Sequence, residues 1–363
     1  MHPLHDWNPK ELYNQLKERE DIKHKRIYSD SNYDLHIFKY VDRPKIANVA
    51  RLARGQIFQV HTEYVTYFNL HMPKFDELVN MCKDSTDYYD RMYAKLLQFG
   101  TKLSAETKVD GTNIHAIRKG DSLFVTSFLT LGDTSETTQA SKAKKMLEKL
   151  NWRQLEENLT ISVELIWHED AKVTKRRGPD NLYLLYASDS NFNMKTSSEL
   201  DEIARKVGLC LPKKFHLHPQ EIIDYLISLD KAKSLYDLQE GLVVECNGEY
   251  YKVKSFLYLL LSHVTIPSHK TLLKIISQKK MTIEKMLDLI TEFDGPLDSA
   301  EILDNILVDV TEEVKKIIAD ISLLKPSNLY EKMKRNPEWI KSDEAFITLV
   351  KHVCNNSLQN AIE

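Results

Sequence analysis

The stretch Thr107–Thr126, TKVDGTNIHAIRKGDSLFVT, decides the fold prediction for this chain. It begins with the tetrapeptide Lys108-Val-Asp-Gly, and residues 112–118 then alternate polar and apolar side chains. Lys119-Gly-Asp is a turn sequence, and residues 122–126 predict a returning strand. The stretch therefore predicts a β-hairpin with a lysine held on a rigid scaffold at its start.

Lys108 is a candidate nucleophile in this setting. A lysine amine attacks electrophiles when nearby positive charge or burial lowers its pKa. Solvated turns carry the same tetrapeptide, so the motif alone does not identify a catalytic lysine. Its meaning depends on the motifs that accompany it.

Three further strand patterns follow and place charged residues at fixed positions. Residues 160–167 predict a strand with Glu164 set among apolar side chains, and Glu240-Gly opens another predicted strand that ends at Glu245. Lys252 and Lys254 lie two residues apart in a third strand pattern. Because side chains alternate along a strand, both ammonium groups point from one face.

This order of motifs resembles the covalent nucleotidyltransferases, which are the polynucleotide ligases and mRNA capping enzymes. The resemblance implies an α+β fold, with an ATP-grasp-like ligase (nucleotidyltransferase) domain of antiparallel sheets and flanking helices. It also implies that Lys108 attacks the α-phosphorus of ATP and retains AMP. Lys252 and Lys254 would stabilise the charge that grows on the phosphoryl oxygens.

Upstream residues narrow the resemblance to one family. Arg54-Gly, followed by Tyr67-Phe68-Asn and then Lys108, is similar to the phage-type tRNA-repair RNA ligases, the RNA ligase 1 family. The resemblance implies that Arg54 contacts ATP phosphates and that Phe68 helps to form the nucleotide pocket. At three positions where that family usually carries lysines, this chain has Thr66, Thr126 and Phe128. Lys74 and Lys119 are candidates to compensate for the missing lysines.

The site prediction also includes a divalent metal. Mg²⁺ binds hard oxygen ligands and keeps most of its waters, so one or two carboxylates suffice, and Mn²⁺ is an alternative ion. Glu240 is the better metal candidate, while Glu164 fits either a metal or a ribose hydroxyl. The expected catalytic residues are Lys108, Lys252 and Lys254, and the expected nucleotide-binding residues are Arg54, Phe68, Lys108, Asp110, Gly111, Glu164, Glu240, Lys252 and Lys254.

Composition and pattern divide the 363 residues into two domains. We expect an adenylyltransferase domain over residues 1–265 and an all-helical domain over residues 266–363, because helical periodicity replaces strand patterns after Lys254. DNA ligases and capping enzymes commonly continue with a strand-rich OB-fold and carry arginine where this chain has Asn113, which favours the RNA ligase branch. The formal net charge of -3, scattered cysteines and missing apolar leader predict a soluble cytoplasmic or other intracellular protein without a membrane span.

The resulting hypothesis is an ATP-dependent RNA ligase. It would join a 5′-phosphate to a 3′-hydroxyl through lysyl-AMP and RNA-adenylate intermediates, in RNA repair and with tRNA as a candidate substrate. The chain has no Gly-x-x-x-x-Gly-Lys motif, so a separate kinase or phosphatase would prepare the RNA ends. A DNA ligase, a capping-type guanylyltransferase and an inactive RNA-binding protein on the same fold are the alternatives.

Several local expectations complete the prediction. A helix is expected over residues 8–22, and the basic run Lys23–Arg26 after it is either a solvated helix end or an RNA contact. The basic loop of residues 172–177 is likewise either solvated or in contact with phosphate. Strands are expected at 33–40, 55–60 and 181–186, and helices at 135–150, 198–209 and 219–239.

Overall fold

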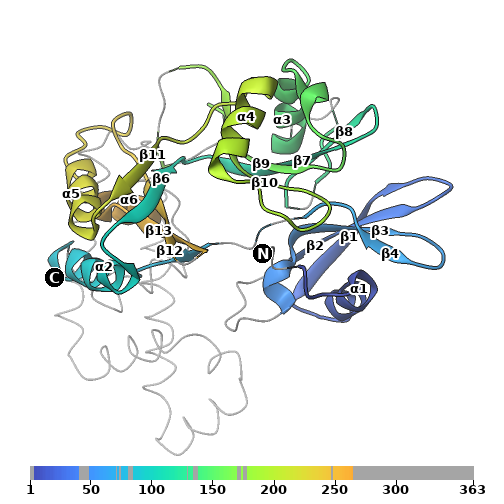
Figure 1. Cartoon of the computed structure of the whole chain (residues 1–363), viewed down its shortest axis with the longest axis horizontal. Helices are drawn as coiled ribbons and strands as arrows, with labels where there is room; N and C mark the ends of the chain where they lie inside the picture. The colour runs from blue at the N-terminus through green and yellow to red at the C-terminus, as the bar shows by residue number, and fades with distance from the viewer. Residues whose placement is uncertain are drawn as a thin grey trace, which may run out of the picture.

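The computed structural model describes most of the expected adenylyltransferase domain (Figure 1). The described residues are 4–40, 49–70, 72, 75–80, 85–128, 130–133, 138–169, 173–174, 178–246 and 248–264. The expected helical domain of residues 266–363 lies outside them, as do Lys74 and most of the basic loop of residues 172–177.

Three sheets, built almost entirely from antiparallel strand pairs, form the described structure. The first has the order β1-β2-β3-β4, the second β10-β9-β7-β8 and the third β11-β6-β12-β13-β5. Figure 1 shows the second sheet beside both of the others. The strands are β1 (Ile22–Ser29), β2 (Asp34–Tyr40), β3 (Arg54–Val60), β4 (Val65–Tyr67), β5 (Asp76–Glu77), β6 (Leu103–Lys108), β7 (Thr112–Lys119), β8 (Ser122–Thr126), β9 (Thr160–Ile166), β10 (Asn181–Ser188), β11 (Lys214–Leu217), β12 (Gly241–Cys246) and β13 (Glu249–Lys254).

The first sheet is covered on one face by helix α1 (Pro9–Lys17). The Asn8 side chain caps this helix by accepting hydrogen bonds from the first-turn amides, and Pro9 fits the first helical position. Leu12 and Leu16 are fully buried in the cluster that also contains Phe38 of β2. The helix expected over 8–22 is therefore too long, because the chain reverses after Lys17 and enters β1.

That reversal changes the setting of the basic run. Lys23–Arg26 belongs to strand β1, whose register pairs Lys23 with Lys39 of β2. Strand β1 is an edge of its sheet, and all four residues of the run are exposed. The run is thus part of a sheet and not the end of a helix.

The second sheet contains the predicted hairpin. Strands β7 and β8 pair in antiparallel register from Lys119 opposite Ser122 to His115 opposite Thr126, so this prediction is confirmed. The core beneath it includes Ile114 and Val163, both fully buried. Helices α3 (Gln139–Leu147) and α4 (Ser197–Val207) lie against this sheet (Figure 1).

The third sheet brings distant motifs together. Gly241 of β12 lies opposite Lys108 of β6 on one side and opposite Lys254 of β13 on the other. The sheet is accompanied by helices α2 (Ser85–Phe99), α5 (Pro219–Leu229) and α6 (Phe256–Val264), which share one hydrophobic cluster with it. This strand order places the start of the hairpin beside the last lysine motif.

Two helix predictions for this region need correction. Helix α5 ends at Leu229, so the helix expected over 219–239 is too long, and α2 had no prediction. Asp230 caps α5 and also accepts hydrogen bonds from the Tyr89 hydroxyl and from the backbone amide of Leu257. These contacts tie the chain to α2 and α6 where it leaves α5.

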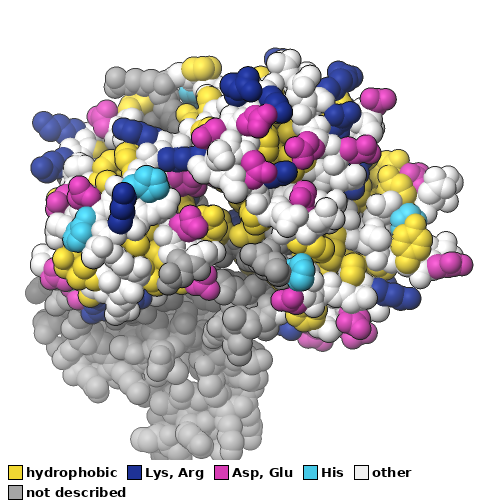
Figure 2. All heavy atoms as spheres, viewed as in Figure 1, with side chains coloured by type: hydrophobic (Ala, Val, Ile, Leu, Met, Phe, Trp, Pro, Cys, Tyr) yellow, Lys and Arg dark blue, Asp and Glu magenta, His cyan; other side chains and the backbone are white. Residues whose placement is uncertain are grey.

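Figure 2 shows Lys and Arg side chains interspersed with Asp and Glu over the visible face, as the near-neutral net charge suggests. Among the described residues, no helix has both the length and the apolar character needed to cross a membrane.

Gly241 gives a test of this strand arrangement. Its φ is +142°, and an added Cβ would lie 2.2 Å from the Val253 carbonyl oxygen. We expect Gly241→Ala to lower the free energy of unfolding by about 2–4 kcal/mol, because the backbone of β13 would have to move. Chemical denaturation measures the change.

The control is Gly120→Ala in the hairpin turn, where φ is +55° and no atom lies within 4 Å of the added Cβ. This variant should lose only about 1–2 kcal/mol for its left-handed backbone. Equal losses in the two variants would contradict the close approach of β12 and β13.

Candidate active site

A cavity of about 570 Å³ lies beside the third sheet and extends to the second. Its walls come from all five strands of the third sheet, from β3, β7, β9 and β10, from helices α4 and α6, and from connecting segments such as the one between β6 and β7. Eight of the nine expected nucleotide-binding residues line it: Arg54, Lys108, Asp110, Gly111, Glu164, Glu240, Lys252 and Lys254.

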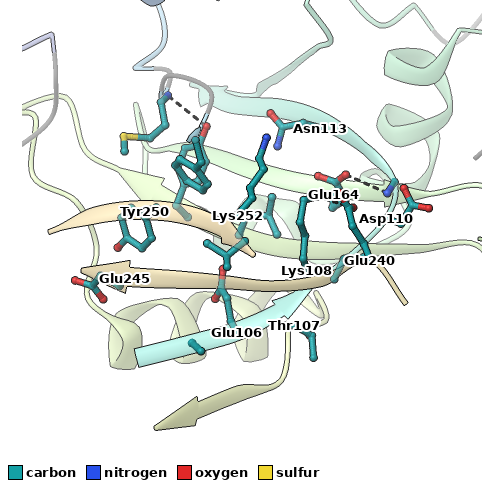
Figure 3. A pocket seen from close by; sticks show the side chains of 18 of the residues that line it. Glu106, Thr107, Lys108, Asp110, Asn113, Glu164, Glu240, Glu245, Tyr250 and Lys252 are labelled. Carbon is teal, nitrogen blue, oxygen red and sulfur yellow. Dashed lines mark hydrogen bonds and ion pairs between the residues drawn. The ribbon is translucent and has the colours of Figure 1, made fainter. Parts of the chain in front are cut away.

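Glu240 lies between two lysines at the centre of the site. Its carboxylate is 2.6 Å from the Lys108 amine and 3.4 Å from the Lys254 amine. Glu240 is only 5% exposed, so its charge depends on these partners. Figure 3 shows Lys108 and Glu240 near Glu164, with Lys252 reaching the same space from the neighbouring strand.

The pKa of Lys108 reflects its acidic surroundings. Burial by itself lowers the pKa of this amine, but the carboxylates of Glu240, Glu164 and Asp110 outweigh burial and raise it. The expectation that nearby positive charge or burial lowers the pKa of Lys108 is therefore not met. Lys108 is held as an ammonium ion, and it must lose a proton before it can attack.

Lys254 has partners on both sides. Its amine lies 3.2 Å from Glu77 of the short strand β5, in addition to Glu240, and 5.6 Å from the centre of the Tyr258 ring. Tyr258 also lines the cavity, from helix α6. These contacts fix the lysine over the sheet, although Glu77 was not among the expected site residues.

The Asp-Gly half of the lysine motif is held by β9 and by the segment between β9 and β10. Asp110 accepts hydrogen bonds from the Thr174 backbone amide and hydroxyl, and the Gly111 amide donates to Glu164 over 3.1 Å. An added Cβ on Gly111 would lie 2.4 Å from the Leu165 carbonyl oxygen. Only glycine permits this approach, which brings Glu164 of β9 next to Lys108.

Arg54 enters the cavity from the start of β3. Its guanidinium carbon lies 4.7 Å from the centre of the Phe128 ring, and burial lowers its pKa despite the opposing influence of Tyr186. No described carboxylate lies within ion-pair distance of this guanidinium. A partly buried arginine with planar donors and no carboxylate partner suits a phosphate group.

Phe68 is the one expected residue that the structure places outside the cavity. It is 3% exposed and packs with Leu35, Ile57 and Ile117 between the first sheet and the hairpin. Lys119, a candidate to compensate for a missing lysine, lies over the Phe68 ring and donates to Asn158, and it does not line the cavity either. The resemblance implies that Phe68 helps to form the nucleotide pocket, but its ring points into this hydrophobic core instead.

The aromatic walls of the cavity come from other residues. They are Phe75, Phe128, Tyr186, Tyr250 and Tyr258. Tyr250 stands in the strand pattern that already contains Lys252, two residues along, so strand alternation could have placed it on the same face.

Glu106 is another cavity residue that the sequence prediction missed. It lies two residues before Lys108 on β6 and therefore shares its face, and it lines the cavity near Glu245 (Figure 3). Burial raises the pKa of Glu106 to about 7, with Lys214 opposing and Glu245 reinforcing the shift. The carboxyl group thus changes charge near neutral pH inside the cavity.

The carboxylates suit a hydrated divalent cation better than a cation held by protein alone. Within the described residues, no group of three or more His, Cys, Asp or Glu side chains could hold a metal ion. Three carboxylates nevertheless act on the single Lys108 ammonium group. Because Mg²⁺ needs only one or two carboxylates, the donor set fits such an ion at Glu240 and Glu164.

Comparison with known proteins gives a fold but no family. No protein-family model and no curated sequence matches the chain. An archaeal ATP-dependent RNA ligase (form 1) superposes with a TM-score of 0.50 at 15% identity, over 86% of this chain and 80% of the other. The chain shares the fold of this ligase.

Two further solved structures give lower TM-scores. A protein of Aquifex aeolicus assigned as an ATP-dependent DNA ligase gives a TM-score of 0.49 at 14% identity, over 85% of this chain and 80% of its own. An RNA ligase of Naegleria gruberi with pyrophosphate gives a TM-score of 0.38 at 18% identity, over 61% and 64%. The expected α+β class with antiparallel sheets is confirmed, and it is the fold of the archaeal ligase.

Glu106 provides a test of the cavity's electrostatics. Its pKa in the folded chain lies above the value of 4.5 for an ordinary glutamate, so the folded state binds more protons between those two pH values. The free energy of unfolding therefore falls as pH rises from 4.5 to about 7. We expect Glu106→Gln to remove this loss. From pH 5 to pH 8, the free energy of unfolding of the variant should therefore rise by about 1–3 kcal/mol relative to that of wild type.

Urea unfolding at both pH values measures the difference. Glu63→Gln, at an exposed position, is the control and should leave the pH dependence unchanged. A Glu106→Gln curve parallel to wild type would show that the carboxyl group is solvated in the folded chain.

Proposed function

We propose that this protein is an ATP-dependent RNA ligase that joins 5′-phosphate and 3′-hydroxyl ends through a lysyl-AMP intermediate. The observation that carries the proposal is the pairing of Lys108 and Lys254 on the buried Glu240, inside a cavity of about 570 Å³. The shared fold with an archaeal ATP-dependent RNA ligase supports the same activity class.

The first step would transfer AMP to Lys108. The amine lone pair attacks the α-phosphorus, a nitrogen–phosphorus bond forms, and the bond to the bridging oxygen breaks to release pyrophosphate. The ammonium group must first give up a proton. The proton would leave by way of its hydrogen-bond partner, Oε2 of Glu240 at 2.6 Å, to solvent, so that Glu240 is again a carboxylate.

Cationic side chains around the cavity would stabilise the charge that develops. Lys252 and Lys254 lie on one face of β13, and Arg54 approaches from β3. Fixed positive groups of this kind favour the transition state because they need no rearrangement during reaction. Mg²⁺ or Mn²⁺, held by Glu240 and Glu164, would supply further neutralisation of the phosphate oxygens.

The later steps concern RNA. AMP would pass to the RNA 5′-phosphate, and the 3′-hydroxyl would then displace AMP to form the phosphodiester bond. A substrate such as nicked tRNA, and a separate enzyme that prepares the ends, follow from the sequence resemblance to phage-type RNA ligases. We propose them on that basis, within an RNA repair pathway.

Lys108→Ala tests the chemistry directly. Wild-type protein incubated with Mg²⁺ and α-labelled ATP should retain acid-labile label, and Lys108→Ala should retain none, because the attacking amine of the proposed step is absent. Lys102→Ala, at the exposed position just before the same strand, should label like wild type. Label from GTP would indicate a capping-type enzyme, and no label from either nucleotide would contradict the proposal.

Sealing assays then separate the RNA and DNA alternatives. A labelled protein that seals a nicked DNA duplex and leaves RNA ends unjoined would be a DNA ligase, which would contradict the RNA assignment alone.

Arg54 gives a second, quantitative test. We expect Arg54→Gln to slow lysyl-AMP formation by about 100-fold, because one preorganised donor to the phosphates is lost. The matched control is Arg153→Gln, since Arg153 stacks on Trp152 at the same 4.7 Å but does not line the cavity. Single-turnover labelling measures both rates, and equal rates for the two variants would remove Arg54 from the site.

A further inference from the structure

Three cations form a row across the first sheet. The strand register places Lys23 of β1 opposite Lys39 of β2, and Lys39 opposite Arg54 of β3. A β-bulge at Gly55, whose φ is +82°, brings Arg54 into this register. Residues that lie opposite one another in a sheet project from the same face, so the three side chains form one row.

Contacts with Phe128 confirm the shared face. The Lys39 amine lies 5.9 Å from the centre of the Phe128 ring, and the Arg54 guanidinium lies 4.7 Å from the same point. Phe38, the neighbour of Lys39, points the other way into the core beneath α1. The row therefore starts in the cavity, where Arg54 and Phe128 lie, and runs outward to the free edge at β1.

A row of positive charges destabilises the folded sheet unless negative charge neutralises it. Like charges directly opposite each other on a sheet repel. Among the described residues no carboxylate lies within ion-pair distance of the three, and only Arg54 is influenced from farther away, by Glu164. Exposed lysines on an edge strand are common because they prevent aggregation, which accounts for Lys23. That explanation does not apply to Lys39, which is half-buried on an inner strand.

We propose that this row binds the sugar-phosphate backbone of the RNA strand whose 5′-phosphate is to be activated. The inference rests on the proposed function and extends it by giving the path of the substrate. Adjacent strands lie about 4.8 Å apart, so the row spans roughly 10 Å from the cavity to the edge. Cations in line along a nucleic-acid backbone supply affinity without reading sequence.

The path also accounts for the basic run in the sequence. Lys23 and Lys25 both lie on β1 and, being two residues apart, share its face, so the edge of the sheet continues the row. A helix end would have dispersed these charges around its axis, whereas the strand aligns them. RNA leaving the cavity would meet Arg54 first, then Lys39 and then Lys23.

The test uses the full chain with Lys23→Gln and Lys39→Gln combined. Binding of a 5′-phosphorylated single-stranded RNA is measured by fluorescence anisotropy at several salt concentrations, and lysyl-AMP formation is measured in parallel. We expect Kd to rise about tenfold and the slope of log Kd against log salt to fall by about 1.4, which is the loss of two phosphate contacts. Lysyl-AMP formation should stay at the wild-type rate, because neither lysine lines the cavity.

The matched control is Lys10→Gln with Lys17→Gln. These lysines lie on α1, which packs on the opposite face of the same sheet, so the net charge changes equally. The control should keep the wild-type Kd and salt slope. If the two double variants behave alike, the row does not bind RNA, and an acidic protein becomes its candidate occupant.

The two proposals fail separately. Absence of lysyl-AMP in wild type contradicts the ligase proposal, while the salt slope of RNA binding still decides the row. Normal lysyl-AMP with an unchanged salt slope in the row variant overturns the row alone.

Discussion

The site depends on one buried carboxylate and the two ammonium groups that neutralise it. Glu240 is 5% exposed, and a charge at that depth is costly unless it is paired. Its partners come from β6 and β13, the strands on either side of β12. Strand order and charge balance are thus a single constraint, because moving either flanking strand would leave a buried charge without its partner.

Glycine at two positions makes this constraint possible. Gly241 lets the backbone of β13 approach β12, and Gly111 lets the turn after Lys108 approach β9. Gly241 directly follows Glu240, and Gly111 ends the motif that begins with Lys108. The residues that carry the chemistry and the residues that permit close backbone contact therefore occur together in the sequence.

The sequence predicted best what is decided by neighbouring residues. The hairpin of β7 and β8 and the shared face of Lys252 and Lys254 follow from turn chemistry and strand alternation, and both are confirmed. Helix ends were predicted less well, since α5 ends where Asp230 meets α2 and α6. Contacts between segments as far apart as Tyr89 and Asp230 cannot be read from local periodicity.

The same limit explains the outcome for the site residues. Phe68 belongs to an aromatic pair that precedes the lysine motif. The first sheet packs against the hairpin, however, and Phe68 points into the hydrophobic core between them. Glu106 shares the face of Lys108 by simple alternation, yet its importance is visible only once Glu245 and the cavity lie beside it. In both residues the local conformation was predictable and the surroundings were not.

The departures from the resembled family have a physical counterpart in the structure. Thr126 is 2% exposed, so a lysine there would bury its charge, and Phe128 offers a ring in place of a cation. That ring holds Arg54 and Lys39, which arrive from the first sheet. Positive charge that the hairpin lacks is thus supplied by β2 and β3 of the first sheet. Because a flat ring stabilises a cation without neutralising it, the charge stays available to an anionic ligand.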